Sequence, residues 1–335
     1  MGENVSIDGM LDTAYLPRII DGRLTELFSQ LPALLLTGPR AVGKTTTARR
    51  HAATIVRLDR EAEAAAFRAD PDAALRVQPE PVLLDEWQAV PTVLGAIKRA
   101  VDDDPRPERF LLTGSVRAEL EAEMWPGTGR LVRLRMYGLT VREFRRRPTA
   151  PTFINRLAEA TIDRFALPPE VPDLAGYVEL ALHSGYPEPT LRLSGPAQQA
   201  WLDGYLDQLL TRDAEGLLGL RDPARLRRYF EALALNTAGL AEHQTLYAAA
   251  GISRLTAIAY DRLLTNLFVL DTVPAWTSNR LSRLVKSAKR YVVDAALVST
   301  ALGVDVAAVL RDGDLLGRLL DTFVMAQLRA EAEVG

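Results

Sequence analysis

The chain has 335 residues, a hydrophobic fraction of 48% and a net charge of −3 at neutral pH. This length predicts more than one domain, and the small net charge gives no overall attraction to nucleic acid or anionic lipid. The absence of cysteine excludes disulfides, thiolate metal sites and cysteine nucleophiles, and three scattered histidines argue against a histidine metal site. No apolar stretch approaches the roughly 20 residues that span a bilayer, and the start lacks a signal-peptide pattern. We therefore expect a cytoplasmic protein without a membrane partner.

The first half of the chain alternates short apolar runs with helix-compatible stretches. Strand candidates lie at residues 33–36, 54–59, 81–86, 109–115 and 130–136. Helix candidates lie at residues 44–53, 61–69 and 91–101. Strands that alternate with helices predict βαβ units and an α/β domain with a parallel sheet.

The segment GPRAVGKT, residues 38–45, joins the first strand candidate to the first helix candidate and matches the phosphate-binding pattern G-x-x-x-x-G-K-[ST]. Gly38 and Gly43 permit backbone torsions that point consecutive amides inward, and these amides form a hole for phosphates with the helix N-terminus. Lys44 is expected to reach the β- and γ-phosphates, and Thr45 to ligate Mg²⁺. The predicted nucleotide-binding residues are Gly38, Pro39, Arg40, Ala41, Val42, Gly43, Lys44, Thr45 and Thr46.

Acidic and hydroxyl residues follow two of the later strand candidates. Asp85 and Glu86 end the apolar run of residues 81–86. Asp85 is expected to hold the Mg²⁺ shell with Thr45, and Glu86 to polarise an attacking water as a general base. Thr113 and Ser115, at the tip of another strand, are candidates to orient that water or to sense the γ-phosphate; turn chemistry is their alternative role. The acid pair favours hydrolysis over mere nucleotide storage.

Five segments carry a family resemblance: YLPR (15–18), LLTGPRAVGKTTTA (35–48), VLLDEWQAVP (82–91), RFLLTGS (109–115) and GRLVRLRMYGLTVREF (129–144). In this order they resemble the bacterial and archaeal AAA-type ATPases that carry a C-terminal DUF4143 region. The resemblance implies a P-loop NTPase core of the ASCE type with strand order 5-1-4-3-2. It also implies Glu86 as the catalytic acid and residues 113–115 as the sensor region. The sequence has no guanine-selective Asn/Thr-Lys-x-Asp element, which favours ATP as the nucleotide.

ASCE ATPases usually need a cationic finger against the γ-phosphate, often from a neighbouring subunit. Arg130, Arg133 and Arg135 follow the sensor region and are the candidates, so a homo-oligomer that supplies this arginine is one expected assembly. Arg18 is expected to border the nucleotide instead. A solvated or salt-bridged surface position is the alternative for each of them.

The second half is expected to be mostly helical, with a winged-helix-like element between residues 240 and 276. A helix at residues 245–250 ends at Gly251, Ser253 caps a second helix, and LFVLDTVPAW follows as a strand. The apolar face predicted for the second helix is Leu255, Ile258, Ala259 and Leu263, and its outward side offers Arg254, Tyr260 and Arg262. A basic stretch follows, with Arg280, Arg283, Lys286, Lys289 and Arg290. Regions 254–262 and 280–290 are therefore candidate DNA contacts, with a packing role as the alternative.

Three further segments belong to the resemblance. HSGYPEP (183–189) resembles a GG[FY]PE element, with Ser184 in place of the first glycine. KRYVVDAAL (289–297) and GDLLGRLLDTFVMAQL (313–328) also match, and in the family the latter opens a nuclease-like module with an acid at the place of Asp321. One acid assembles no nuclease site, so none is predicted.

These observations predict four regions. They are a P-loop ATPase domain at 1–147, a helical connection at 148–238, a winged-helix-like region at 239–300 and the start of an incomplete nuclease-like module at 301–335. The expected function is Mg-dependent hydrolysis of ATP to ADP and phosphate, coupled to the second half. The alternative is a non-hydrolysing nucleotide switch or DNA-binding regulator. A kinase-like phosphotransferase is a third hypothesis, which the DEWQ segment disfavours because it indicates water as the acceptor.

Overall fold

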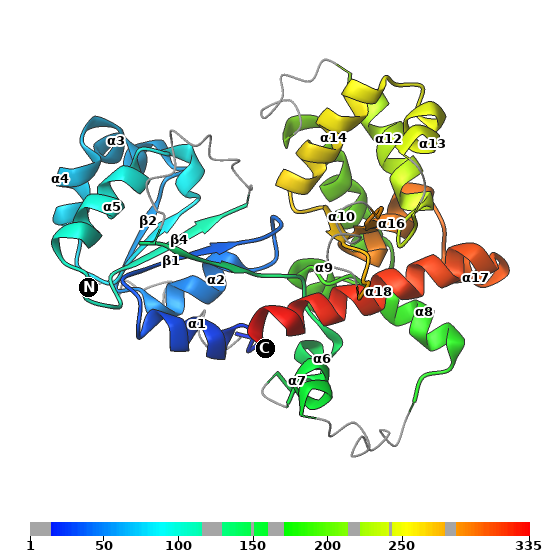
Figure 1. Ribbon diagram of the computed structural model, residues 1–335, viewed down its shortest axis with the longest axis horizontal. Helices are drawn as coiled ribbons and strands as arrows, with labels where there is room; N and C mark the ends of the chain where they lie inside the picture. Colours follow the sequence, from blue (N-terminus) through cyan, green and yellow to red (C-terminus); the bar gives the residue numbers. More distant parts are fainter. Residues whose placement is uncertain are drawn as a thin grey trace, which may run out of the picture.

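The computed structural model describes residues 15–115, 129–148, 151–159, 171–213, 222–240, 243–278 and 286–335. A sheet with helices on both faces lies beside a second, mostly helical half (Figure 1). No helix in these described ranges combines the length and the apolar character that crossing a bilayer requires.

A five-stranded parallel sheet forms the centre of the first half. Its strands are β1 (Ala33–Thr37), β2 (Thr54–Arg57), β3 (Val82–Asp85), β4 (Phe110–Gly114) and β5 (Val132–Arg135). They are arranged in the order β2-β3-β4-β1-β5, and every adjacent pair is parallel. This confirms the expected order 5-1-4-3-2. It also places the ends of β1, β3 and β4, where the sequence motifs lie, at one edge of the sheet.

The apolar residues of β1 alternate between two helical layers. Leu34 and Leu36 pack with α1 (Asp21–Phe28) and α2 (Lys44–Ala48). Leu35 belongs to a separate core on the other face. The helices of that second layer are α3 (Glu61–Ala69), α4 (Pro71–Arg76) and α5 (Val93–Asp103). Because β1 is covered on both faces, its sequence is a continuous apolar run and not an alternating one.

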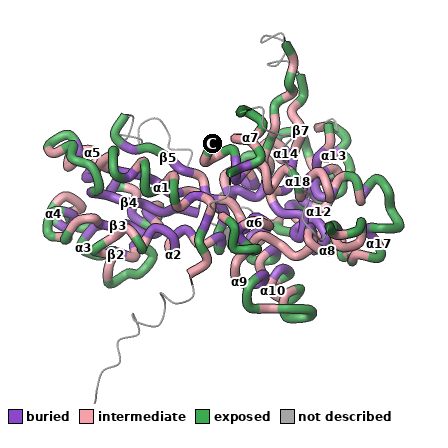
Figure 2. The backbone as a smooth tube through the Cα atoms, turned by 90° about the horizontal axis from the view of Figure 1, so that it is seen from below, coloured by how far each residue is buried: buried purple, intermediate pink, exposed green. Residues whose placement is uncertain are grey.

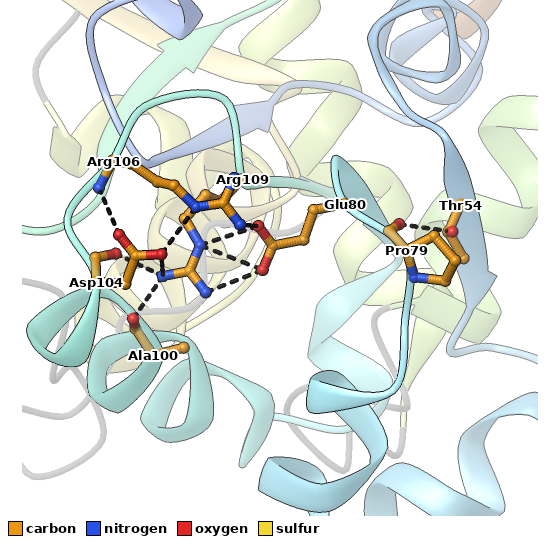
Figure 3. A network of polar contacts seen from close by, with 7 residues as sticks. All are labelled: Thr54, Pro79, Glu80, Ala100, Asp104, Arg106 and Arg109. Atoms are coloured by element: carbon orange, nitrogen blue, oxygen red, sulfur yellow. Dashed lines mark hydrogen bonds and ion pairs between the residues drawn. The ribbon is translucent and has the colours of Figure 1, made fainter.

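A network of polar contacts closes the edge of the sheet opposite to those motifs (Figure 3). Arg109, just before β4, donates through Nε to Oε2 of Glu80 at 3.0 Å and through Nη2 to Oε1 at 2.9 Å. Its Nη1 donates to the carbonyl of Ala100 in α5. Thr54 at the start of β2 donates to the carbonyl of Pro79 at 2.7 Å. These contacts join the starts of β2, β3 and β4 at the amino edge of the sheet, away from the sequence motifs at its carboxyl edge.

The second half consists of helices and one two-stranded sheet. Its helices are α6 (Val141–Phe144), α7 (Phe153–Ala158), α8 (Leu174–Leu182), α9 (Pro187–Arg192), α10 (Gly195–Gln208), α12 (Pro223–Leu235), α13 (His243–Ala249), α14 (Arg254–Asn266), α16 (Ala295–Leu302), α17 (Val306–Arg311) and α18 (Gly313–Val334). The strands β6 (Leu270–Val273) and β7 (Lys289–Val292) pair antiparallel. The expectation of a mostly helical second domain is confirmed.

Helices α13 and α14 are joined by a short turn at residues 250–253. Gly251 adopts φ +66° in the turn, and the Ser253 side chain accepts a hydrogen bond from the Thr256 amide at 3.1 Å, as an N-cap does. The face predicted for α14 was partly wrong: Leu263 is buried and Arg254 and Arg262 are exposed, as expected, but Tyr260 is 4% exposed and Leu255 is 79% exposed. The buried stripe is Ala257, Tyr260, Leu263 and Leu264, continued by Leu267. The stripe ends at Leu267, one turn after Leu263, the last residue of the predicted face. The ring of Tyr260 packs against that of Tyr229 in the core.

One apolar core extends from the sheet into the helical half. Leu24 and Leu34 belong to the same cluster of buried residues as Leu206 and Leu297. Figure 2 shows buried segments in both halves of the molecule. The helical half is therefore packed against the sheet half and is not tethered to it by a linker alone.

The last helix, α18, runs from α17 back to the sheet half (Figure 1, red). Near its end, Glu333 accepts a hydrogen bond from the Arg135 amide of β5 at 2.7 Å, and Glu331 forms an ion pair with Arg142 at 2.9 Å.

Asp321, the acid of the nuclease resemblance, forms an ion pair with Lys289 at 2.8 Å. In the described ranges no three acidic, histidine or cysteine residues are grouped to hold a metal. The four predicted region boundaries stay predictions.

Candidate active site

The loop from Gly38 to Gly43 leaves β1 at the carboxyl edge of the sheet and enters α2. Gly38 has φ +151°, and a Cβ added to it would lie 2.1 Å from the carbonyl oxygen of Met136. Gly43 has φ +96° at the N-cap of α2, and Ala41 between them also has a positive φ of 62°. A side chain at Gly38 would collide with the backbone just after β5, so the close approach of this segment to the loop requires glycine there.

Lys44 is 5% exposed and points under this loop. Its Nζ donates to the carbonyl oxygens of Gly38 at 3.0 Å and Pro39 at 2.8 Å. Burial lowers the pKa of Lys44 to about 8, although Glu86 and Asp85 act in the opposite direction. The predicted phosphate-binding ammonium is therefore at the loop, close to two carboxylates.

Asp85, at the end of β3, accepts hydrogen bonds from two hydroxyl groups. Thr45 Oγ1 donates to its Oδ1 at 2.7 Å, and Thr113 Oγ1 donates to the same oxygen. The structure thus brings together the two predicted metal ligands and one predicted sensor residue. These oxygen donors fit Mg²⁺, which is usually held by one or two protein ligands together with water and substrate phosphates.

Glu86 follows β3 with a left-handed backbone, φ +54°. Its amide donates to Thr113 Oγ1 at 3.3 Å, and its carboxylate Oε2 accepts a hydrogen bond from Ser115 Oγ at 3.0 Å. Gln88 Nε2 donates to the same Oε2. Gln88 was part of the DEWQ segment but was not among the predicted site residues. Its position two residues after the acid, in the 3₁₀ turn Trp87–Ala89, is the sequence signal that was missed.

A cavity of about 410 Å³ opens beside the loop. The sheet half lines it with Glu86, with Ala41 and Gly43 of the loop, and with residues 44–47 of α2. Tyr15, Leu16, Arg18 and Leu139 form another part of its wall. The second half contributes Pro187, Glu188, Leu191 and Arg192 from α9. Of these, Tyr15, Leu16, Thr47, Leu139 and the α9 residues were not predicted as site residues. The α9 residues reach the loop because the two halves pack together.

Arg18 borders the cavity, as expected, but its guanidinium is engaged by the protein. It donates to the carbonyl oxygens of Val42 at 2.7 Å and Tyr137 at 2.8 Å, and pairs with buried Glu143 at 2.9 Å. Arg18 therefore joins the phosphate-binding loop to the segment after β5. This contact holds the loop in place and leaves Arg18 little freedom to reach a phosphate.

The three arginine-finger candidates do not line the cavity in the described part of the chain. Arg130 precedes β5 and pairs with Asp102 at 2.8 Å, at the edge of the sheet away from the loop. Arg133 lies opposite Leu35 in the middle of β5. Arg135 forms an ion pair with Asp271 of β6 at 2.9 Å. Within the described residues, none of these three candidates thus reaches the cavity of its own chain, and a role for Arg130 or Arg133 toward a second subunit stays a prediction.

The HSGYPEP loop connects α8 to α9 and sets α9 against the cavity. Ser184 has φ +70°, which explains why the resembling element has glycine at this position. Buried Asp294, the N-cap of α16, accepts hydrogen bonds from the Gly185 amide at 2.7 Å and from Ser184 Oγ at 3.0 Å. Gly185 in turn approaches Leu139, whose amide donates to its carbonyl at 2.5 Å. The loop is therefore a backbone contact between the two halves.

The predicted DNA-contacting region is only partly described. Arg254 and Arg262 on α14 and Lys286 before β7 are exposed. Lys289 is paired with an aspartate of α18. Arg280 and Arg283 lie outside the described residues.

Comparisons with known proteins find a nucleotide-binding domain type in the part of the chain that contains the sheet and the loop. Residues 30–145 match the family model of an AAA domain, and residues 174–308 match a domain of unknown function, DUF8612. The second match is to a different family from the DUF4143 that the resemblance implied. The Walker-type ATPase PABY2304 of Pyrococcus abyssi is similar in fold, with a TM-score of 0.52 and 15% identity over 88% of this chain and 97% of that one.

Two curated relatives cover more of the sequence. The uncharacterized proteins Rv2008c of Mycobacterium tuberculosis and Mb2031c of Mycobacterium bovis are each 31% identical over 315 residues, which is 92% of this chain. The chain spans 64% of the length of these relatives. The AAA match over residues 30–145, the sheet order and the loop geometry together show that the first half of the chain is a P-loop domain similar to AAA domains.

Proposed function

We propose that the protein binds ATP with Mg²⁺ and hydrolyses it to ADP and phosphate, and that its nucleotide state is coupled to the helical half. The observation that carries this proposal is the convergence of four side chains beside one loop. Lys44, Thr45 and Glu86 line the same cavity, and Asp85 contacts Thr45 at 2.7 Å. This set matches the parts that P-loop ATPases use for phosphate, metal and water.

The loop amides and Lys44 would bind the phosphates. The ammonium that now donates to two loop carbonyls is the group that a terminal phosphate attracts, because a charge-assisted bond to phosphate is stronger than one to a neutral carbonyl. Thr45 and Asp85 would hold Mg²⁺, which supplies charge neutralisation at the phosphates when bound. Glu86 would accept the proton of the attacking water, as a general base within reach of the cavity.

The second half forms part of the cavity wall, and this supports a coupling between the nucleotide state and the helical half. Pro187, Glu188 and Arg192 of α9 line it together with the P-loop residues. The Tyr205 hydroxyl of α10 also donates to the carbonyl of Arg40 in the loop, at 3.4 Å. A bound nucleotide would therefore contact both halves, and loss of its terminal phosphate would change contacts to both.

A comparison of Glu86→Gln with the wild type tests the proposal. Phosphate release with Mg²⁺ and ATP should fall by at least about 100-fold, the scale of a lost general base, while a fluorescent ATP analogue binds as tightly as before. Glu26→Gln, an exposed glutamate of α1, is the matched control and should hydrolyse normally. Equal turnover in Glu86→Gln and wild type would remove Glu86 from the mechanism, and no turnover in the wild type would refute the ATPase itself.

The second candidate is a non-hydrolysing switch or a DNA-binding regulator. Two observations favour it: the helices α13 and α14 are followed by the antiparallel strands β6 and β7, and Arg254 and Arg262 are exposed on α14. A fluorescent DNA duplex titrated at two salt concentrations tests this candidate, with Arg254→Gln plus Arg262→Gln against Arg23→Gln on α1. Binding that weakens with salt and with the paired substitution supports it. No binding at low salt rejects it.

A further inference from the structure

Gln88 reaches back to the carboxylate of Glu86 in a closed set of three polar side chains. Gln88 Nε2 donates to Oε2 of Glu86 and to Ser115 Oγ at 3.4 Å. Ser115 Oγ donates to the same Oε2 at 3.0 Å. The amide group thus uses both of its N–H donors, and the hydroxyl both donates and accepts. A carboxylate only accepts hydrogen bonds, so the amide nitrogen of Gln88 must be the atom that faces it.

Both donors act on one oxygen of Glu86. Within the described residues, its second oxygen, Oε1, accepts no hydrogen bond, and the side chain lines the nucleotide cavity. The terminal torsion of a glutamate is otherwise broad and only weakly restricted. Two donors on Oε2 therefore fix the orientation of the carboxylate and leave Oε1 as the oxygen available to a water.

Packing on Gly114 holds Gln88 in this position. A Cβ added to Gly114 would lie 2.6 Å from Trp87 Nε1 and 3.1 Å from Gln88 Oε1, so both side chains pack directly on the glycine backbone. Trp87 is buried, and Ser115 follows Gly114 at the tip of β4. The DEWQ and LTGS segments therefore form one unit, in which the second segment supplies both the surface for Gln88 and the second donor to Glu86.

We propose that Gln88 is a positioning residue for hydrolysis, which together with Ser115 orients Glu86 so that its free oxygen meets the attacking water. The inference rests on the proposed ATPase function. Gln88 acts through Glu86 and does not contact the nucleotide, because Glu86, and not Gln88, lines the cavity. Gln88 is thus expected to affect the chemical step and to leave nucleotide binding unchanged.

The experiment compares Gln88→Met, Gln88→Glu and Gln78→Met with the wild-type chain. Methionine keeps the length of the side chain and removes its donors. Gln78 after α4 is the matched control, since its side chain donates to the carbonyl of Ala74, away from the cavity. Gln88→Met should lower kcat by about 10- to 100-fold, the effect of a misplaced catalytic group, at an unchanged Kd for a fluorescent ATP analogue. Gln78→Met should match the wild type.

Gln88→Glu supplies a readout that a purely structural role would not give. Its new carboxylate repels Glu86, but when protonated it donates a hydrogen bond in place of the amide. A carboxyl beside another carboxylate titrates above its ordinary value of about 4.3. The ratio of kcat for Gln88→Glu to kcat for Gln88→Met should therefore rise as the pH is lowered from 8 to 6.

The outcomes separate the two proposals. Wild-type turnover with an unchanged kcat in Gln88→Met overturns the positioning role and leaves the ATPase standing. A lost affinity for the analogue in Gln88→Met, or a ratio that stays flat with pH, also overturns it, because either result assigns Gln88 to binding or to folding. A wild-type chain without turnover refutes the ATPase first.

Discussion

Thr45 Oγ1 lies 2.7 Å from Asp85 Oδ1, although the two residues are 40 positions apart in the chain. One begins α2 after the loop and the other ends β3, and the parallel sheet brings them to the same edge. These two oxygens are the protein ligands that we propose for Mg²⁺, so the proposed metal site rests on this contact.

Asp85→Asn should weaken the response to Mg²⁺ more than the binding of nucleotide. The amide keeps the shape of the side chain but removes its charge, so the Mg²⁺ concentration for half-maximal phosphate release should rise by about 10- to 100-fold. Asp103→Asn, an exposed aspartate at the end of α5, should leave the titration unchanged. An unshifted titration in Asp85→Asn would show that Asp85 does not support the metal.

Lys44 should make nucleotide binding depend on pH above neutrality. Its pKa of about 8 means that the unliganded protein loses the ammonium charge as the pH rises through 8. Bound phosphates stabilise the charged form, so binding takes up a proton above that pH. The affinity for an ATP analogue should be flat from pH 7 to 8 and then fall, by at most about tenfold per pH unit.

Lys44→Met provides the test of that assignment. This variant should bind the analogue more weakly at pH 7, and its affinity should no longer fall above pH 8. The control Lys98→Met on α5 should keep the wild-type fall in affinity. Lys98 is a partly exposed lysine paired with Asp102. A fall that persists in Lys44→Met would assign the titration to another group.

The same pKa sets the sign of an effect on stability. The folded-state pKa of Lys44 lies below its ordinary value of 10.5, so the unfolded chain binds more protons between about pH 8 and 10.5. The free energy of unfolding of the wild type relative to Lys44→Met should therefore rise across this window in urea titrations. A relative stability that falls with pH there would contradict the buried, charge-disfavouring environment of Lys44.

Gly114→Ala should destabilise the fold and impair turnover together. The added methyl would lie 2.6 Å from Trp87 Nε1, and a buried indole has little room to move. Overpacking of this kind costs about 1–3 kcal/mol, measurable by urea unfolding. Gly22→Ala on α1 meets no atom within 4 Å. It should stabilise by up to about 1 kcal/mol, since alanine is the better helix former.

Arg18→Met should destabilise the protein by about 3–5 kcal/mol, because it leaves the buried carboxylate of Glu143 without its charged partner. Arg23→Met, which breaks an exposed pair with Glu26, should change the free energy of unfolding by less than about 0.5 kcal/mol. Similar values for the two variants would mean that Arg18 does not hold the loop to the segment after β5.

Much of the first half was readable from local pattern. The continuous apolar runs of β1, β3 and β4 predict buried parallel strands, and the P-loop spacing predicts a phosphate-binding turn. Both rest on properties of neighbouring residues, namely burial of a short strand and the torsions of Gly38 and Gly43. The strand order followed from the family resemblance, since periodicity alone carries no information about which strands pair.

The face of α14 was not readable from local pattern. Leu255 and Tyr260 are both apolar enough to be buried, but the fold buries Tyr260, whose ring packs against that of Tyr229 in the core. The arginines after the sensor region illustrate the same limit. The register of β5 against β1 places Arg130 away from the loop, and no spacing in the sequence reports that register.

The amino-acid sequence determined the phosphate-binding loop, the acids Asp85 and Glu86 and the strand and helix types around them, because each depends on residues close together in the chain. Tertiary structure alone decided that Gln88 and Ser115 share one oxygen of Glu86 and that α9 lines the nucleotide cavity. Such contacts join residues from different strands or from different halves. They depend on how layers pack against one another, which is a property of the whole fold and not of any one segment.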